Sequence, residues 1–307
     1  MDYRFLRTQS YVLLGLYFLI LVLLSTLFLF GDKTRGVVSW FYIGKVAFQP
    51  VEIGKLVMVL LLAKYFSRRH IEIYRLRHLI ISGIYILIPL LLVLIQPDLG
   101  SAIIFLSLWI AIAVFSGIKL KHFILFILLL TVVSVFAWNF ALAPYQKERI
   151  TSFLNPYEDP LGAGYNAIQA KIAVGSGKIF GKGVGYGSQS SLNFLPAAET
   201  DFIFAAFTEE WGLIGALMLF GGFAVLFWRI IKIGLNVSDN FSRLYTLGFS
   251  SIILSQFIVH VGMNIGLMPI TGITLPFVSY GGSSLVSLMI GIGVLQNIKI
   301  NSRRELD

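Results

Sequence analysis

Eight long apolar stretches divide this chain, and they restrict its fold more than any other feature. A run of roughly 20 mostly apolar residues is long enough to cross the hydrocarbon core of a bilayer as a helix. A spanning segment must satisfy its own backbone hydrogen bonds, so helices are expected. The sequence therefore predicts an all-α polytopic membrane protein, a single integral membrane domain over residues 1–307, with spans at 11–30, 48–66, 79–95, 99–117, 122–142, 202–231, 245–267 and 281–298.

Composition agrees with a membrane protein. The chain is 57% hydrophobic and 13% charged, whereas soluble domains carry about 25% charged residues. It has no cysteine, which excludes disulfides and thiolate metal sites. Its four histidines do not have the spacing of a metal-binding motif. His260 lies on an apolar helix and is expected to be a hydrogen-bonded core residue.

The positive charge predicts an orientation. A net charge of +9 would suit nucleic acid, but in membrane proteins Lys and Arg gather in cytoplasmic loops. Placing both termini in the cytoplasm puts most basic residues inside, including the cluster at 68–77. The first span has no cleavage site after it, so we expect a retained anchor. The partner expected from charge is therefore the membrane, and no nucleic acid.

A long polar loop, residues 143–200, joins the fifth and sixth spans and is predicted to lie outside. Structureless loops of this length are uncommon, so we expect it to carry its own structure. Residues 145–155 predict a helical extension that stops at Pro156. Residues 165–174, which include Gln169 and Lys171, predict a short amphipathic helix in the membrane interface.

The glycine-rich segment, residues 175–187, follows that helix and carries Lys178 and Lys182. Glycines and lysines together can hold a phosphate through backbone N–H groups and point charges. No register fits either common nucleotide-binding pattern. A flexible loop with solvated lysines explains the segment as well, and spacing alone favours that interpretation.

Several acidic residues interrupt the apolar segments. Glu52 and Lys55 are three residues apart and share a helix face, so they form either a structural ion pair or part of a substrate site. Asp98 precedes the fourth span and is expected to cap it. Glu209 and Glu210 lie inside the sixth span, where two acids are costly, so at least one is expected to line a polar cavity.

Asp201 lies where the long loop meets the sixth span. A carboxylate there either caps the helix or serves in catalysis, and spacing does not separate the two. Residues 268–284, between the last two spans, contain two prolines and three glycines. Such irregular backbone is tolerated at membrane depth only where it is buried or lines a cavity, so we expect it to form the wall of a site.

These segments together resemble the SEDS (shape, elongation, division and sporulation) family, most closely its rod-shape-determining members. The resemblance implies the family's fold without its first two helices, leaving eight spans. Ser39, Val51, Ala197 and Glu199 depart from the family pattern. The matching segments run in family order at 48–55, 96–101, 155–171, 175–183, 194–212 and 263–284.

The resemblance implies a peptidoglycan glycosyltransferase of the bacterial cytoplasmic membrane that polymerises lipid II. It implies inverting transfer, release of undecaprenyl pyrophosphate, a role in cell elongation, and a class B penicillin-binding transpeptidase as partner. The family's catalytic aspartate falls at Asp201, and its glutamate–lysine pair at Glu52 and Lys55. Asp98 and Glu209 are expected to support the site. The residues expected to bind substrate are Arg149, Gln169, Lys171, Lys178 and Lys182.

A divalent cation, Mg²⁺ or Mn²⁺, is expected to assist the departing pyrophosphate. Two other classes of function stay open at this point. A flippase or transporter of lipid-linked oligosaccharide would also be polytopic with charges inside the membrane. A non-catalytic scaffold that recruits a transpeptidase would need the fold but not Asp201.

Overall fold

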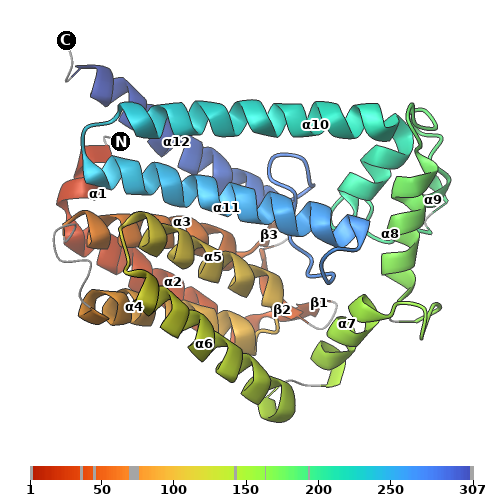
Figure 1. Ribbon diagram of the computed structural model, residues 1–307, viewed down its shortest axis with the longest axis horizontal. Coiled ribbons are helices and arrows are strands. Elements are labelled where there is room, and N and C mark those ends of the chain that lie inside the picture. The colour runs from red at the N-terminus through yellow and green to blue at the C-terminus, as the bar shows by residue number, and fades with distance from the viewer. Residues whose placement is uncertain are drawn as a thin grey trace. The chain divides into compact units, whose positions relative to one another are not determined.

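The structure is a computed structural model that describes residues 3–34, 37–43, 46–68, 76–141, 144–162, 164–192 and 194–304. Most of the chain is helical (Figure 1). The long helices are α2 (Ser10–Phe30), α3 (Pro50–Ser67), α4 (Leu76–Ile95), α5 (Leu99–Phe115), α6 (Leu120–Phe136), α10 (Ile203–Asn236), α11 (Asn240–Ile265) and α12 (Gly282–Arg304). The short ones are α1 (Tyr3–Thr8), the π-helix η1 (Ala137–Ala141), α7 (Pro144–Leu154), α8 (Tyr165–Ser176) and α9 (Ser188–Ser191).

Each of the eight predicted spans coincides with one long helix, which confirms the all-α class. By length and apolar composition, α2, α4, α10, α11 and α12 are able to cross a membrane. The shorter α5 is also apolar, and α3 carries Glu52, Lys55 and Lys64 among its apolar residues. The chain is thus a multi-pass membrane protein, and the number of crossings stays a prediction.

A small antiparallel sheet follows α2 and was not predicted. Its strands β1 (Asp32–Thr34), β2 (Val37–Ile43) and β3 (Val46–Phe48) are paired in the order β1-β2-β3. β1 and β3 have three residues each, and β2 (VVSWFYI) is apolar except for one serine. None of them therefore shows the alternation of apolar and polar residues that is the usual sequence signal for a strand.

The chain divides into two compact units. Unit 1 comprises residues 1–124, 227–255 and 282–307, and unit 2 comprises residues 125–226 and 256–281. In unit 1, α3 packs against α2, α5 and α12, and nearly all of its residues are buried. A helix enclosed by others needs no polar face. The Ser283 hydroxyl joins α12 to the start of α3, since it accepts the Gln49 N–H at 3.0 Å and donates to the Ala47 carbonyl at 3.2 Å.

Unit 2 contains the long loop, and it is structured as expected. α7 ends two residues before Pro156, and α8 covers the predicted helix at 165–174. The buried face of α8 is made by Ala170 and Ala173, whereas Ile172 is 44% exposed. The two alanines form a core cluster with Leu195, Phe202 and Ala205.

Candidate active site

A tight turn places Asp201 immediately before α10. The carbonyl of Ala197 accepts the N–H groups of Thr200 and Asp201 at 3.1 Å and of Phe202 at 3.3 Å. Ala197 has a φ of 56°, a left-handed conformation that costs a residue with a Cβ some strain. Phe202 is buried in the cluster beside α8. Asp201 is therefore a half-buried residue held between the loop and the first turn of α10.

One buried side chain of α11 fixes the backbone at this point. The Asn264 side-chain amide donates to the Asp201 carbonyl at 3.1 Å and to the His260 carbonyl at 2.8 Å. Its oxygen accepts the Ala205 N–H at 3.1 Å. The sequence interpretation gave Asn264 no role. The available signal was a polar amide inside an apolar span, which is costly unless fully bonded.

The segment at 266–281 is irregular, as its prolines and glycines predicted. Its Ser279 hydroxyl donates to the Thr200 carbonyl at 2.8 Å, and the Tyr280 N–H donates to the Glu199 carbonyl at 2.9 Å. Gly272 has a φ of 74°, and a Cβ placed on it would lie 3.9 Å from Oδ2 of Asp201. The Asp201 carboxylate thus faces this segment, which forms one wall of the candidate site.

The glycine-rich segment (175–187) forms backbone hydrogen bonds with α10 at a break in that helix. Gly212 interrupts the helix with φ 65° and ψ −163°. The N–H groups of Lys182 and Gly183 donate to the carbonyls of Glu209 and Glu210 at 3.0 Å. In return the Leu213 N–H donates to the carbonyl of Lys178 at 2.9 Å. The broken helix therefore exchanges backbone hydrogen bonds with the loop, which is how non-helical backbone inside a span is satisfied.

Close approach of two backbones explains two of the glycines, Gly177 and Gly181. A Cβ on Gly177 would overlap the Thr208 carbonyl, and one on Gly181 would lie 2.7 Å from the Gly212 nitrogen. Several amides that a phosphate cradle would need are already bonded to α10. Gly177 and Gly181 thus serve packing, and the lysine side chains are the main groups that this segment offers to an anion.

Glu209 anchors the same segment. Its carboxylate is fully buried and lies 2.7 Å from the Lys182 ammonium. It also accepts hydrogen bonds from the Ser188 hydroxyl at 3.2 Å and from the N–H groups of Gln189 at 3.1 Å and Ser190 at 3.3 Å. A buried carboxylate with this many donors is satisfied. Its described partners all belong to the loop.

Glu210 also turns toward the loop, because its Oε1 accepts the Gly185 N–H at 3.0 Å. The sequence predicted that at least one of the two glutamates lines a polar cavity, and this stays a prediction. In the structure both carboxylates bond to the glycine-rich segment and the residues that follow it, and partners this far along the chain could not be read from helix periodicity.

The remaining predicted substrate residues lie around unit 2. Lys171 of α8 is half-buried, and its alkyl chain lies against Gly266, so that a Cβ there would overlap it. Gln169 is half-buried on the same helix. Lys178 is exposed and has a φ of 48°. Arg149 lies in α7, and its side chain is outside the described part of the structure. Their roles in substrate binding stay predictions.

The polar residues of unit 1 form the contacts that spacing predicted. The Lys55 ammonium lies 2.7 Å from Oε1 of Glu52, and both side chains are buried. Asp98 caps α5, because its Oδ1 accepts the Ser101 N–H at 2.9 Å. Burial raises the pKa of the Asp98 carboxyl, and the hydrogen bonds with Ser101 oppose that shift in part. Glu52 and Lys55 thus neutralise each other, and Asp98 bonds to the first turn of α5, all within unit 1.

Two further predictions concern histidine and metal. His260 is fully buried, with Nδ1 2.7 Å from the Ile273 carbonyl, which confirms its core position. Among the residues that the structure describes, no group of three or more His, Asp or Glu side chains could hold a metal ion. The divalent cation therefore stays a prediction.

Comparison with known proteins gives consistent matches over nearly the whole chain. The family model FTSW_RODA_SPOVE, described as a cell cycle protein, matches residues 1–304. The chain is 39% identical over 303 residues to stage V sporulation protein E of Bacillus subtilis (strain 168), covering 98% of this chain and 82% of that protein. It is 38% identical over 283 residues to the peptidoglycan glycosyltransferase MrdB of Escherichia coli (strain K12), covering 92% and 76%.

A solved structure reported as "Structural coordination of polymerization and crosslinking by a peptidoglycan synthase complex" has the same fold. Its TM-score is 0.83 at 31% sequence identity, and the match covers 98% of this chain and 84% of that one.

Proposed function

This chain belongs to the FtsW, RodA and SpoVE family, the SEDS family expected from its motifs, and we propose that it is a peptidoglycan glycosyltransferase that polymerises lipid II. Relatives named as peptidoglycan glycosyltransferases support the reaction class. The structural observation that carries the proposal is Asp201, a half-buried carboxylate whose backbone is held by Asn264 beside the irregular segment at 266–281.

The chemistry is a single displacement at an anomeric carbon. The 4-hydroxyl of one lipid-linked disaccharide gives its proton to Asp201 while its oxygen forms a bond to the anomeric carbon of another. The bond from that carbon to the pyrophosphate oxygen breaks, and undecaprenyl pyrophosphate leaves. An α-linked donor thereby yields a β-linkage. A positioned general base contributes typically 10²- to 10⁴-fold to such a step.

The departing pyrophosphate requires positive charge. The ammonium of Lys182 is already paired with the Glu209 carboxylate at 2.7 Å. That carboxylate neutralises most of its charge, so less is left to attract a phosphate. Lys178 is exposed on the neighbouring turn, and Lys171 lies on α8. We infer that these two lysines are the stronger candidates for the phosphates, while Lys182 keeps the loop in place. No step here is routed through a divalent cation.

The proposal extends to place and partner. We place both termini in the cytoplasm and the 143–200 loop outside the bacterial cytoplasmic membrane, because Lys and Arg gather on the inner side. The similar solved structure is a complex that coordinates polymerization and crosslinking, which supports a class B penicillin-binding transpeptidase as partner. Among division, sporulation and elongation, we propose elongation, since the motifs most resemble rod-shape-determining members.

Polymerisation of purified lipid II tests the catalytic assignment. Asp201→Asn protein in proteoliposomes, with and without a transpeptidase partner, is expected to make glycan at least about 100-fold more slowly than wild type. Glu199→Gln is the matched control, because it removes a carboxylate two residues away. Wild-type rates from folded Asp201→Asn protein would show that Asp201 is not the base.

The same preparations separate the alternatives. A flippase would move labelled lipid II across vesicles without forming glycan, and a scaffold would bind its transpeptidase but make no glycan even as wild type. Glycan formation by the wild-type chain that depends on Asp201 fits neither alternative.

A further inference from the structure

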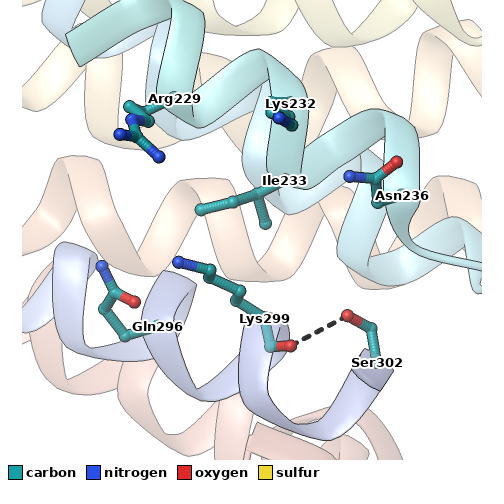
Figure 2. A pocket seen from close by; sticks show the side chains of 7 residues that line it. All are labelled: Arg229, Lys232, Ile233, Asn236, Gln296, Lys299 and Ser302. Carbon is teal, nitrogen blue, oxygen red and sulfur yellow. Dashed lines mark hydrogen bonds between the residues drawn. The ribbon is translucent and has the colours of Figure 1, made fainter. Parts of the chain in front are cut away.

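A cavity of about 560 Å³ lies between the last turns of α10 and α12 in unit 1 (Figure 2). Figure 2 shows the Arg229 guanidinium pointing from α10 toward α12 and Lys299 extending from α12 toward α10. Lys232 of α10 also lines the cavity, so three cations from two helices border one space. The polar groups that line it are Arg229, Lys232, Asn236, Gln296, Lys299 and Ser302.

Converging positive charges call for an anion. Like charges around one cavity repel each other, and among the described residues that line it none is acidic. The acid at the following turn, Asp239, lies 3.7 Å from Arg7 and is engaged elsewhere. The oxygens of a phosphate would accept hydrogen bonds from the guanidinium and both ammonium groups. The Ser302 hydroxyl already donates to the Lys299 carbonyl at 3.0 Å, so the lining amides are the further donors.

The surroundings of the cavity indicate a lipid rather than a soluble anion. Trp228 is 57% exposed, and its ring centre lies 5.2 Å from the Arg229 guanidinium carbon and 5.6 Å from the Lys232 ammonium. Tryptophan beside basic residues at a helix end is typical of the membrane–water interface. Ile300, which follows Lys299 in α12, is 52% exposed and adds an apolar side chain next to the basic ones.

A simpler explanation is that each basic side chain extends separately to water from the end of its helix. That explanation accounts for lysine and arginine near a helix end. It does not account for their presence from α10 and α12 around one partly open cavity. The volume also falls in the range of about 300–1,000 Å³ that is usual for small-molecule sites.

We propose that this cavity binds the phosphate headgroup of an anionic phospholipid whose acyl chains lie in the adjoining membrane. The site lies at the end of unit 1 that carries the N-terminal helix, because the Tyr3 N–H donates to Oδ1 of Asn297 at 2.9 Å. Basic pockets between membrane helices are a recognised setting for anionic headgroups.

Native mass spectrometry of the full chain tests the site. Protein exchanged into phosphatidylglycerol is expected to retain bound lipid, and protein in phosphatidylcholine is not. The Arg229→Gln/Lys232→Gln/Lys299→Gln variant should lose affinity by about fivefold per cation removed. The matched control, Arg77→Gln/Lys119→Gln/Lys121→Gln, removes the same charge elsewhere in unit 1 and should retain the lipid. Lys232→Arg/Lys299→Arg keeps the charge and should bind.

Three outcomes would overturn the proposal. Equal retention of both lipids would show that the cavity does not select an anion. Equal loss in the control variant would reduce the effect to overall surface charge. Competition by glycerol phosphate as strong as that of a short-chain phosphatidylglycerol would assign the site to a soluble phosphate. Should the triple variant fail to fold, Lys299→Gln alone decides, because unchanged lipid retention in that variant contradicts the proposal.

Discussion

The side-chain amide of Asn264 donates a hydrogen bond to the backbone carbonyl of Asp201 at 3.1 Å. The same side chain accepts the N–H of Ala205 in the first turn of α10. Asn264 thus fixes the backbone on both sides of the α10 start, and with it the position of the Asp201 backbone. A general base acts only from a defined position.

We expect Asn264→Ala to lower lipid II polymerisation by about 10- to 100-fold, because small misplacements of a catalytic group are costly. The substitution should also destabilise the fold by about 1–3 kcal/mol, since the buried backbone groups that bond to the Asn264 side chain lose their partner. Asn301→Ala, another buried asparagine, is the matched control. A rate loss no larger than that of the control would mean that Asn264 serves stability only.

Removing only Lys182 from the Lys182–Glu209 ion pair should destabilise the fold more than removing both charges. Lys182→Met leaves Glu209 charged and fully buried, and we expect a cost of about 3–5 kcal/mol. Adding Glu209→Gln should restore part of that stability, because the buried charge is then gone. Thermal unfolding of the single and double variants measures the coupling. Additive losses would argue against direct pairing.

Glycines of one unit should differ sharply in their tolerance of alanine. Gly181 has a φ of 80° and lies against the backbone of the α10 break, whereas a Cβ added to Gly221 in α10 would meet nothing within 4 Å. Gly181→Ala is expected to reduce the yield of folded protein. Gly221→Ala should be neutral or stabilising by up to about 1 kcal/mol, because alanine favours helix. Yield by size-exclusion chromatography and thermal unfolding check both expectations.

Asp98 should make stability depend on pH. Burial raises the pKa of its carboxyl above the ordinary value of 3.8, so the folded chain binds the proton more tightly than the unfolded chain. The contribution of Asp98 to stability is therefore greatest below pH 3.8 and falls as the pH rises to the folded pKa. Asp98→Asn should remove this dependence while its oxygen still caps α5. The unfolding midpoint should be measured against pH for wild type and Asp98→Asn. Equal pH dependence in the two proteins would show that the pKa of Asp98 is not shifted.

Local pattern alone determined a large part of the molecule. The spans follow from apolar length, and each predicted range became a helix, because the membrane admits little else. The Glu52–Lys55 pair and the Asp98 cap follow from three-residue spacing at a helix end. The irregular segment at 266–281 follows from its prolines and glycines. In each case the partners lie within a few residues, so periodicity is sufficient.

Tertiary structure decided which distant groups meet. Lys182 reaches Glu209 across 27 positions of the chain, and Asn264 reaches Asp201 across 63. The break at Gly212 is satisfied by the glycine-rich segment, and the cations of α10 and α12 share one cavity because the two helices lie together. Helix and turn preferences are local free energies. The choice of a distant partner depends on packing, burial and charge satisfied together, and the folded chain alone sets these.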